Sequence, residues 1–209
     1  MTIRPVSASF TSMSFAAGRR NITSGAIRFT TSGRRSRQKR ELTSPLSKTD
    51  FQIRPATERD VPVILSFIRQ LAEYERLSHE AIMTEEILRQ SLFGPRPAAE
   101  VLLGYSAGTP VAFAVFFHNF STFLGRSGMY LEDLFVIPEM RGKGFGKAML
   151  VELAKIARDR KCGRFEWAVL DWNESAINFY KSLGAVAMDE WTIFRVTGQA
   201  LDRLAGGAL

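Results

Sequence analysis

A glycine-rich segment between a strand-like run and a helix-like run constrains this chain more than any other feature. The run that starts at Tyr130, Tyr-Leu-Glu-Asp-Leu-Phe-Val-Ile, carries two carboxylates and stops at Pro138. Arg141-Gly-Lys-Gly-Phe-Gly146 follows, and residues 147–160 have the pattern of a helix. Glycine lets a backbone approach a bulky anion, and the free N–H groups at a helix N-terminus attract negative charge. The segment therefore predicts a phosphate cradle with acidic groups one strand away.

The glycine spacing excludes two better-known phosphate motifs. A P-loop needs four residues between its first glycine and a Gly-Lys-Ser/Thr triplet, and this loop lacks that triplet. The Rossmann fingerprint needs Gly-x-Gly-x-x-Gly, but the third residue after Gly144 is Lys147. The alternative to a cradle is a glycine-rich turn with its basic residues in solvent. The position between a strand and a helix favours the cradle.

Charge is divided unevenly along the chain. The 209 residues carry a formal net charge of +7, but residues 1–40 hold nine basic side chains and no acidic one. Residues 41–209 hold the remaining 19 basic and 21 acidic side chains, so this part is slightly acidic. The overall basicity is therefore poor evidence that the folded part binds nucleic acid.

We expect residues 1–50 to form a disordered basic N-terminal extension, because they are rich in Ser, Thr and Arg without sustained periodicity. Three functions are open for this extension. Its composition is that of a transit peptide, which would target the protein to an organelle. It could also be an electrostatic arm for nucleic acid or an anionic membrane. We favour the third, an unstructured extension of a cytoplasmic protein, because no cleavage signal is recognisable.

Apolar periodicity and turn residues divide residues 51–205 into the strands and helices of one domain. Strands are expected at residues 51–55, 101–107, 111–120, 129–137, 164–170 and 186–196. Helices are expected at residues 61–76, 85–93, 147–160 and 174–183. This order predicts an α/β fold, in which a mixed central sheet has helices on both faces.

Several chemistries lack the residues that they need. Cys162 is the single cysteine, so no intramolecular disulfide can form, and no histidine stands near it to support a nucleophilic thiol. His79 and His118 are isolated, and without ligand spacing for zinc we expect no metal site. No apolar run is long enough to span a bilayer, and we expect no membrane partner.

Several ordered motifs resemble those of the GCN5-related N-acetyltransferase (GNAT) superfamily. Its signature Arg/Gln-x-x-Gly-x-Gly/Ala fits the loop from Arg141 to Gly146. Three further segments are similar to its diamine (spermidine/spermine) N-acetyltransferase branch with plant and bacterial relatives: Tyr130-Leu-Glu-Asp-Leu-Phe-Val136, Trp172-Asn-Glu-Ser-Ala-Ile-Asn-Phe-Tyr-Lys181 and Ile53-Arg-Pro-Ala-Thr57. The resemblance covers about residues 51–205. It implies the GNAT acyl-CoA N-acyltransferase fold, acetyl-CoA as co-substrate and a homodimer.

The resemblance also implies that a substrate amine attacks the thioester of acetyl-CoA directly. An alkyl amine, with a pKa of about 10.4, must first lose a proton, and the departing thiolate benefits from gaining one. Tyr180 matches the general acid of the family, and Glu132 matches the carboxylate that binds the amine and draws away its proton. From the residues alone, Tyr180 is better explained as a core tyrosine, and Glu132 could be a solvated strand carboxylate.

Strict alternation along the strand predicts that Tyr130, Glu132, Leu134 and Val136 share one face and that Asp133 points to the other. Two acids within an otherwise apolar run are unusual for a merely solvated strand. The resemblance implies that Glu132 contacts the substrate amine. We expect Asp133 to contact the substrate too, and a structural hydrogen-bonding role explains Asp133 at least as well.

Further contacts with both substrates are implied by the resemblance. Main-chain N–H groups, basic side chains and one amide would bind the cofactor: Leu134, Phe135, Val136, Arg141, Gly142, Lys143, Gly144, Phe145, Gly146, Lys147 and Asn173. A helix cap explains Asn173 equally well. Tyr74 and Glu75 match a polyamine-contacting stretch, and the solvated face of an amphipathic helix explains them equally well.

We therefore expect an acetyl-CoA-dependent N-acetyltransferase for a small di- or polyamine. However, Met188-Asp-Glu-Trp191 is more similar to bacterial and plant relatives, some of which acetylate ornithine or thialysine-like amines. An acetyltransferase for an amino-acid side-chain amine is thus the alternative. An alternative of another class is a non-catalytic acyl-CoA-binding or nucleic-acid-associated protein, because a fold does not fix a function.

Overall fold

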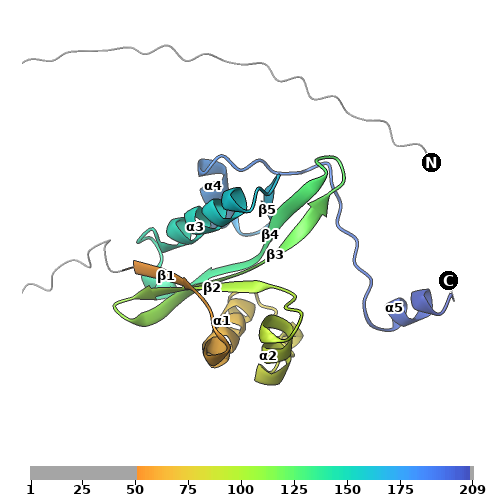
Figure 1. Cartoon of the computed structure of the whole chain (residues 1–209), viewed down its shortest axis with the longest axis horizontal. Helices are drawn as coiled ribbons and strands as arrows, with labels where there is room; N and C mark the ends of the chain where they lie inside the picture. Colours follow the sequence, from red (N-terminus) through yellow and green to blue (C-terminus); the bar gives the residue numbers. More distant parts are fainter. Residues whose placement is uncertain (1–50, 208–209) are drawn as a thin grey trace, which may run out of the picture. The chain divides into compact units, whose positions relative to one another are not determined.

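A five-stranded sheet forms the centre of the computed structural model, which describes residues 51–207 (Figure 1). The strands lie side by side in chain order: β1 (Phe51–Pro55), β2 (Glu100–Ser106), β3 (Thr109–Ser121), β4 (Arg126–Val136) and β5 (Phe165–Trp167). The three neighbouring pairs from β1 to β4 are antiparallel, whereas β5 is parallel to β4. The predicted mixed sheet is confirmed. The extension predicted at residues 1–50 lies outside the described residues.

Helices cover both faces of this sheet, as predicted. They are α1 (Val61–Tyr74), α2 (Glu85–Phe93), α3 (Phe145–Asp159), α4 (Glu174–Ser182) and α5 (Gly198–Ala205). Figure 1 shows α1 and α2 on one face, with α3 and α4 on the other. Short 3-10 turns lie at Glu58–Asp60, Ser78–Glu80 and Pro138–Met140. In the part of the chain that the structure describes, no helix is both long and apolar enough to cross a membrane.

Two apolar clusters join the helices to the sheet. On the α1 face, Phe67 of α1 stacks on Phe113 of β3 with ring centroids 5.3 Å apart. On the α3 face, Met149 and Leu153 belong to the same buried cluster as Leu131 of β4. Each fully buried side chain of this size contributes about 1.5 to 3 kcal/mol to the free energy of unfolding. The two clusters therefore fix the sheet between its helical layers.

An ion pair fixes the point at which α1 begins. Arg54 of β1 donates to both carboxylate oxygens of Asp60, at 2.8 and 2.9 Å. Thr57 donates to the same carboxylate through its backbone N–H and its hydroxyl. The Arg54 bonds are the main reason that the pKa of Asp60 lies well below its usual range. Because the start of α1 is fixed in this way, its C-terminal end at Tyr74 also has a defined position on the sheet.

The strand predicted at residues 186–196 is not formed. No regular structure lies between α4 and α5, and Val186, Trp191 and Phe194 are 82, 71 and 89% exposed. The unpredicted helix α5 follows, and Figure 1 shows it apart from the sheet. A strand needs a neighbour for its N–H and C=O groups, and no strand among residues 51–207 pairs with this segment.

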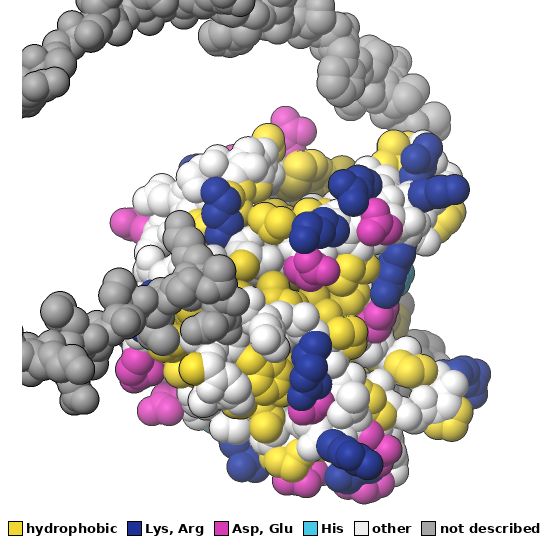
Figure 2. Space-filling view, turned by 60° about the vertical axis from the view of Figure 1, so that its left-hand side comes forward, with side chains coloured by type: hydrophobic (Ala, Val, Ile, Leu, Met, Phe, Trp, Pro, Cys, Tyr) yellow, Lys and Arg dark blue, Asp and Glu magenta, His cyan; other side chains and the backbone are white. Residues whose placement is uncertain are grey.

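Charged side chains of both signs share the surface of the described part. Figure 2 shows Lys and Arg side chains interspersed with Asp and Glu side chains on the face in view. This mixture agrees with the near balance of charge over residues 41–209.

Candidate active site

The glycine loop joins the end of β4 to the start of α3. Gly142 and Gly144 have φ angles of +75° and +85°, in the left-handed region that favours glycine. A Cβ atom added at either position would meet nothing within 4 Å, so space is open on this side of the loop. Gly144 is the N-cap of α3, and no side chain caps the first turn. The loop and the uncapped N–H groups fit the phosphates of a coenzyme A thioester.

The start of α3 is anchored to the first strand of the domain. Phe145, the first residue of α3, stacks on Phe51 of β1 with centroids 4.2 Å apart and ring planes 6° from parallel. The helix therefore begins two residues before the predicted position, and Lys147 lies in its first turn. Lys143 is exposed, with Nζ 3.1 Å from the sulfur of Met140. The loop residues thus lie together as predicted, and their cofactor contacts stay predictions.

A β-bulge at Glu132 overturns the predicted faces of β4. Asp133 is opposite Val115 and Leu131 is opposite Phe116, so Glu132 has no partner in the register between β3 and β4. Val115 packs with the core on the α1 face, and opposed residues of an antiparallel pair share a face. Asp133 therefore lies on the α1 face. The extra residue reverses the side-chain alternation that the sequence pattern assumed.

The same bulge separates residues that strict alternation would keep together. Tyr130 is opposite Phe117, and their rings lie 5.2 Å apart. Leu134 and Val136 pack against the cluster on the α3 face, which also contains Leu131. The prediction that Tyr130 shares a face with Leu134 and Val136 is therefore wrong. Bulges are common beside active sites because they redirect side chains in this way.

Three carboxylates gather where the bulge meets the end of α1. Asp133 is half-buried, and this burial, with the charges of Glu132 and Glu75, raises its pKa to about 6. Burial also raises the pKa of Glu75, which directly follows α1. Glu132 is exposed. A carboxyl with a pKa near 6 can take up a proton near neutral pH, so Asp133 is at least as well suited to this task as Glu132.

Tyr180 faces the same cluster from α4. Its ring lies 5.1 Å from that of Trp167 in β5, and the residue is half-buried. Burial raises the pKa of its phenol, and the charges of Glu75 and Tyr74 raise it further. Tyr180 packs against the core, as the residues alone suggested, and it lies near Tyr74 and Glu75, while its catalytic role stays a prediction. The phenol is therefore protonated at neutral pH, as a proton donor requires, and burial does not change that state.

The two parallel strands diverge at this point. β5 pairs with β4 only from Met129 to Leu131, and it ends at Trp167 rather than at the predicted residue 170. On that side of β4, residues 132–136 have no strand partner among the described residues. The main-chain groups of these residues therefore make no ladder hydrogen bonds on that side of β4 within the described part of the chain. The contacts of Leu134, Phe135 and Val136 with the cofactor stay predictions.

Two further side chains, one aromatic and one cationic, contact Tyr74 beside the site. The sequence did not predict either contact. Trp172, which is 53% exposed, lies 6.0 Å from Tyr74 between ring centroids. The guanidinium of Arg141 lies over the Tyr74 ring instead of along the glycine loop. An exposed tryptophan just before a helix could have marked the first contact, whereas nothing in the sequence indicates the second.

Asn173 acts as a helix cap. Its side-chain oxygen accepts a hydrogen bond from the backbone N–H of Ala176 at 3.2 Å and one from the hydroxyl of Ser175 at 3.1 Å. The capping interpretation is therefore confirmed. A contact between Asn173 and the cofactor stays a prediction.

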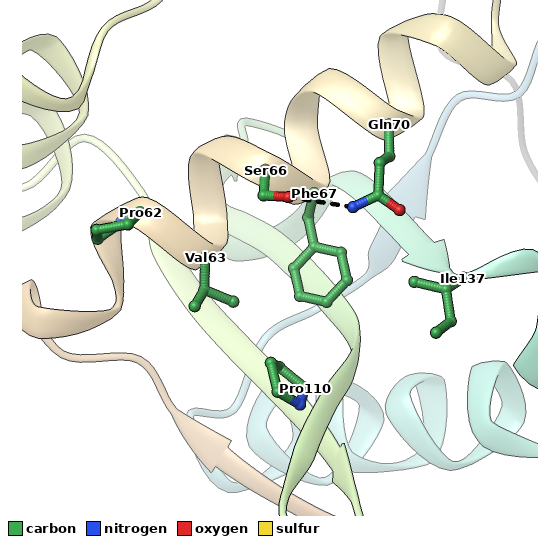
Figure 3. Close-up of a pocket in the computed structure, with 7 residues that line it drawn as sticks. All are labelled: Pro62, Val63, Ser66, Phe67, Gln70, Pro110 and Ile137. Atoms are coloured by element: carbon green, nitrogen blue, oxygen red, sulfur yellow. Dashed lines mark hydrogen bonds between the residues drawn. The ribbon is translucent and has the colours of Figure 1, made fainter.

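A separate cavity of about 410 Å³ lies between α1 and the start of β3 (Figure 3). Its lining is mostly apolar: Pro62, Val63, Ser66, Phe67, Gln70, Pro110 and Ile137. Its two polar side chains bond to each other, with Gln70 donating to Ser66 at 3.2 Å. No residue of the carboxylate cluster or the glycine loop lines this cavity, so we do not assign it to the reaction.

Comparisons with known proteins agree with this geometry. The sequence model of the Acetyltransferase (GNAT) family matches residues 66–185. Thialysine N-epsilon-acetyltransferase of Mus musculus is 41% identical over 166 residues, which cover 74% of this chain and 97% of the mouse protein. An L-ornithine acetyltransferase of Arabidopsis thaliana is 36% identical, over 78% of this chain and 91% of the plant protein. Among solved structures, an integron cassette protein from the mobile metagenome of V. cholerae has a TM-score of 0.65 and 27% identity, covering 75% of this chain and 98% of its own.

Proposed function

We propose that this chain, which belongs to the Acetyltransferase (GNAT) family and is an acetyl-CoA-dependent amine N-acetyltransferase, acts on the side-chain amine of a small amino acid. The observation that carries the proposal is the 41% identity to a thialysine acetyltransferase along 97% of that protein. The ornithine acetyltransferase supports it independently. Both relatives favour the alternative acceptor of the sequence analysis over the di- or polyamine that was expected first. We assign the catalytic domain to residues 51–205.

The first step is the binding of the acceptor as a cation. Its ammonium group would lie among Glu75, Glu132 and Asp133, whose negative charges come from α1 and the bulge of β4. The amine must be uncharged to attack, so one of these carboxylates takes up its proton. We assign this role to the neighbours Glu132 and Asp133. The raised pKa of Asp133 favours such an acceptance near neutral pH.

The second step needs the acetyl group beside the amine. Acetyl-CoA supplies this group as a thioester, which the amine nitrogen attacks at the carbonyl carbon. The cradle at Gly142 and Gly144 would hold the phosphates, while main-chain groups of residues 134–136 contact pantetheine and polarise the carbonyl. A new N–C bond replaces the C–S bond. Tyr180 donates its phenolic proton to the departing sulfur, which gives free coenzyme A, and the nitrogen of the new amide loses its second proton, which restores the phenol.

A panel of amines tests this function directly. Purified full-length protein is given acetyl-CoA with thialysine, ornithine, lysine, putrescine or spermidine, and thiol release is followed. We expect kcat/KM to be largest for an amino acid. The di- or polyamine alternative requires the opposite order. Binding of acetyl-CoA with no turnover of any primary amine would instead indicate the non-catalytic protein.

The C-terminal segment supports the proposal that the enzyme is a homodimer. Residues 186–196 carry exposed apolar side chains, including Ile193 at 77% and Phe194 at 89% exposure. Among the described residues, β5 has a strand partner on one side only. Exposed apolar segments and open sheet edges both mark sites of association between chains. A second copy of the chain would cover this segment.

A further inference from the structure

The Arg141 side chain is held at three points on the acceptor side of the glycine loop. Its guanidinium carbon lies 4.3 Å from the ring centroid of Tyr74 and 5.4 Å from that of Phe135. Its Nε donates a hydrogen bond to the carbonyl oxygen of Val136 at 3.0 Å. These contacts place the guanidinium against one ring at the end of α1 and one ring of β4. They also fix the plane of the guanidinium before any ligand arrives.

The held guanidinium has no carboxylate partner among residues 51–207. Three other arginines that join separate segments of the domain each have one: Arg54 pairs with Asp60, Arg89 with Glu58 and Arg160 with Glu100. For the Arg141 side chain, the bond from Nε to the carbonyl oxygen of Val136 is the single hydrogen bond to a described residue. Its terminal nitrogens therefore present a planar pair of donors, and this geometry matches a carboxylate in a two-point contact.

The surroundings of Arg141 contain the opposite charge in excess. Tyr74, on which the guanidinium is stacked, directly precedes Glu75, and the charge of Glu75 acts on both Asp133 and Tyr180. This part of the domain thus combines several carboxylates with one cation that is held by its neighbours. A diamine would match the carboxylates but would be repelled by the cation. A zwitterionic amino acid would match both.

We propose that the Arg141 side chain binds the α-carboxylate of the acceptor and thereby selects amino acids over the corresponding diamines. This inference rests on the proposed function, because it presupposes an amino-acid substrate. The backbone of Arg141 remains part of the phosphate cradle, while its side chain serves the acceptor. Arg141 is then a specificity-determining residue of the acetyl transfer.

The test uses acceptor pairs that differ only in the carboxylate: ornithine with putrescine, and lysine with cadaverine. For the full-length enzyme, kcat/KM is measured for each amine, and the KM for acetyl-CoA is measured separately. We expect Arg141→Gln to lower kcat/KM for ornithine by about 10- to 100-fold, because a bond between charged groups is lost. Putrescine should be acetylated as fast as before or faster. Arg141→Lys keeps the charge without the two-point geometry and should restore part of the preference.

Lys143→Gln is the matched control, because it removes a positive charge from an exposed side chain of the same loop. This substitution should change kcat/KM by the same factor for both amines of a pair. If Arg141→Gln instead lowered kcat/KM equally for both amines and raised the KM for acetyl-CoA, that result would assign the guanidinium to the cofactor phosphates and overturn the inference. The inference would also fail if Arg141→Gln kept the native preference for ornithine. A wild-type enzyme that acetylates no amino acid would refute the proposed function itself, and with it this inference.

Discussion

Tyr180 and Asp133 come from different elements and are far apart in sequence, yet burial raises the pKa of both side chains and the charge of Glu75 adds to both shifts. This shared neighbour is the residue-level reason for assigning them to one site. Tyr180 is a neutral donor in a half-buried position, and Asp133 is a carboxyl that titrates near pH 6. Groups whose pKa values are shifted by their surroundings are typical of catalytic sites, although ion-pair networks also shift them.

Tyr180→Phe should lower kcat by about 100- to 10,000-fold, because the departing thiolate loses its proton donor. The affinity for acetyl-CoA should stay within about twofold, since the ring and its packing on Trp167 are kept. Steady-state kinetics and a calorimetric titration measure the two quantities. Tyr105→Phe is the matched control, because this hydroxyl bonds to Arg54 and Asp60 away from the site. Equal kcat values for both variants would remove Tyr180 from the mechanism.

Asp133→Asn should stabilise the protein at alkaline pH. The pKa of Asp133 rises from 3.8 to about 6 on folding, so the native state binds the proton more tightly and loses stability as pH rises through this window. The Asp133→Asn variant does not lose this stability, because an amide does not ionise in this pH range. Its free energy of unfolding should exceed that of the wild type by about 2 to 3 kcal/mol at pH 8, and by only about 0.5 kcal/mol at pH 4, which is close to the unfolded pKa of 3.8.

Urea denaturation at both pH values measures this difference. Asp202→Asn in α5 is the control, because that carboxylate is exposed and the variant should show no gap at either pH. If the difference in the free energy of unfolding between wild type and Asp133→Asn were the same at both pH values, folding would not raise the pKa of Asp133. A gain in stability with a loss of activity is the result expected of a functional residue.

At the scale of elements, the site depends on how β4 ends. The bulge at Glu132 redirects the acids, the short β5 leaves residues 132–136 without a partner, and the glycine loop then turns the chain into α3. Two of the loop's glycines have the positive φ angles that make this turn.

Gly144→Ala should lower the free energy of unfolding by about 1 to 2 kcal/mol, because its φ of +85° is unfavourable for a residue with a Cβ atom. Acetyl-CoA affinity should also fall, since the first turn of α3 would shift. Gly146→Ala is the matched control for stability. It lies inside α3, its Cβ would be 3.8 Å from a methyl group of Val136, and it should gain about 0.5 to 1 kcal/mol. Equal effects of the two substitutions in urea denaturation would contradict the role of the turn.

At the scale of the whole molecule, the C-terminal segment is the part that the single chain leaves unexplained. Its apolar side chains are exposed along residues 186–196, and α5 continues with Leu201 and Leu204 about half exposed. A monomer gains nothing from this arrangement, whereas burial in a second copy would remove the apolar surface from water.

Replacing Trp191 and Phe194 by serine should convert a dimer into a monomer, because both exposed rings would lose their place in the interface. Sedimentation velocity at micromolar concentration measures the change. Ile82→Ser is the control, since Ile82 is also 84% exposed but lies in the loop before α2, and the dimer should persist. A wild type that is monomeric at this concentration would contradict the proposal.

Local patterns determined most of the secondary structure of residues 51–183, the mixed sheet and the glycine loop. Periodicity, caps and glycines act within a few residues, so a sequence contains them in full. The chain alone could not determine the faces of β4, because a single bulge at Glu132 reverses the alternation and depends on the register with β3. Nor could it determine the strand expected at residues 186–196, because a strand exists only beside a neighbour.

The amino-acid sequence by itself thus determined the fold class and the place of the anion cradle, because both depend on short-range geometry. The tertiary structure alone decided which acids meet: Asp133 is directed to the α1 face, where Glu75 lies near it and near Tyr180. It also decided that the Arg141 guanidinium lies on Tyr74 and not along its own loop. Contacts between residues tens of positions apart depend on how the packed elements converge, and no local pattern encodes that convergence.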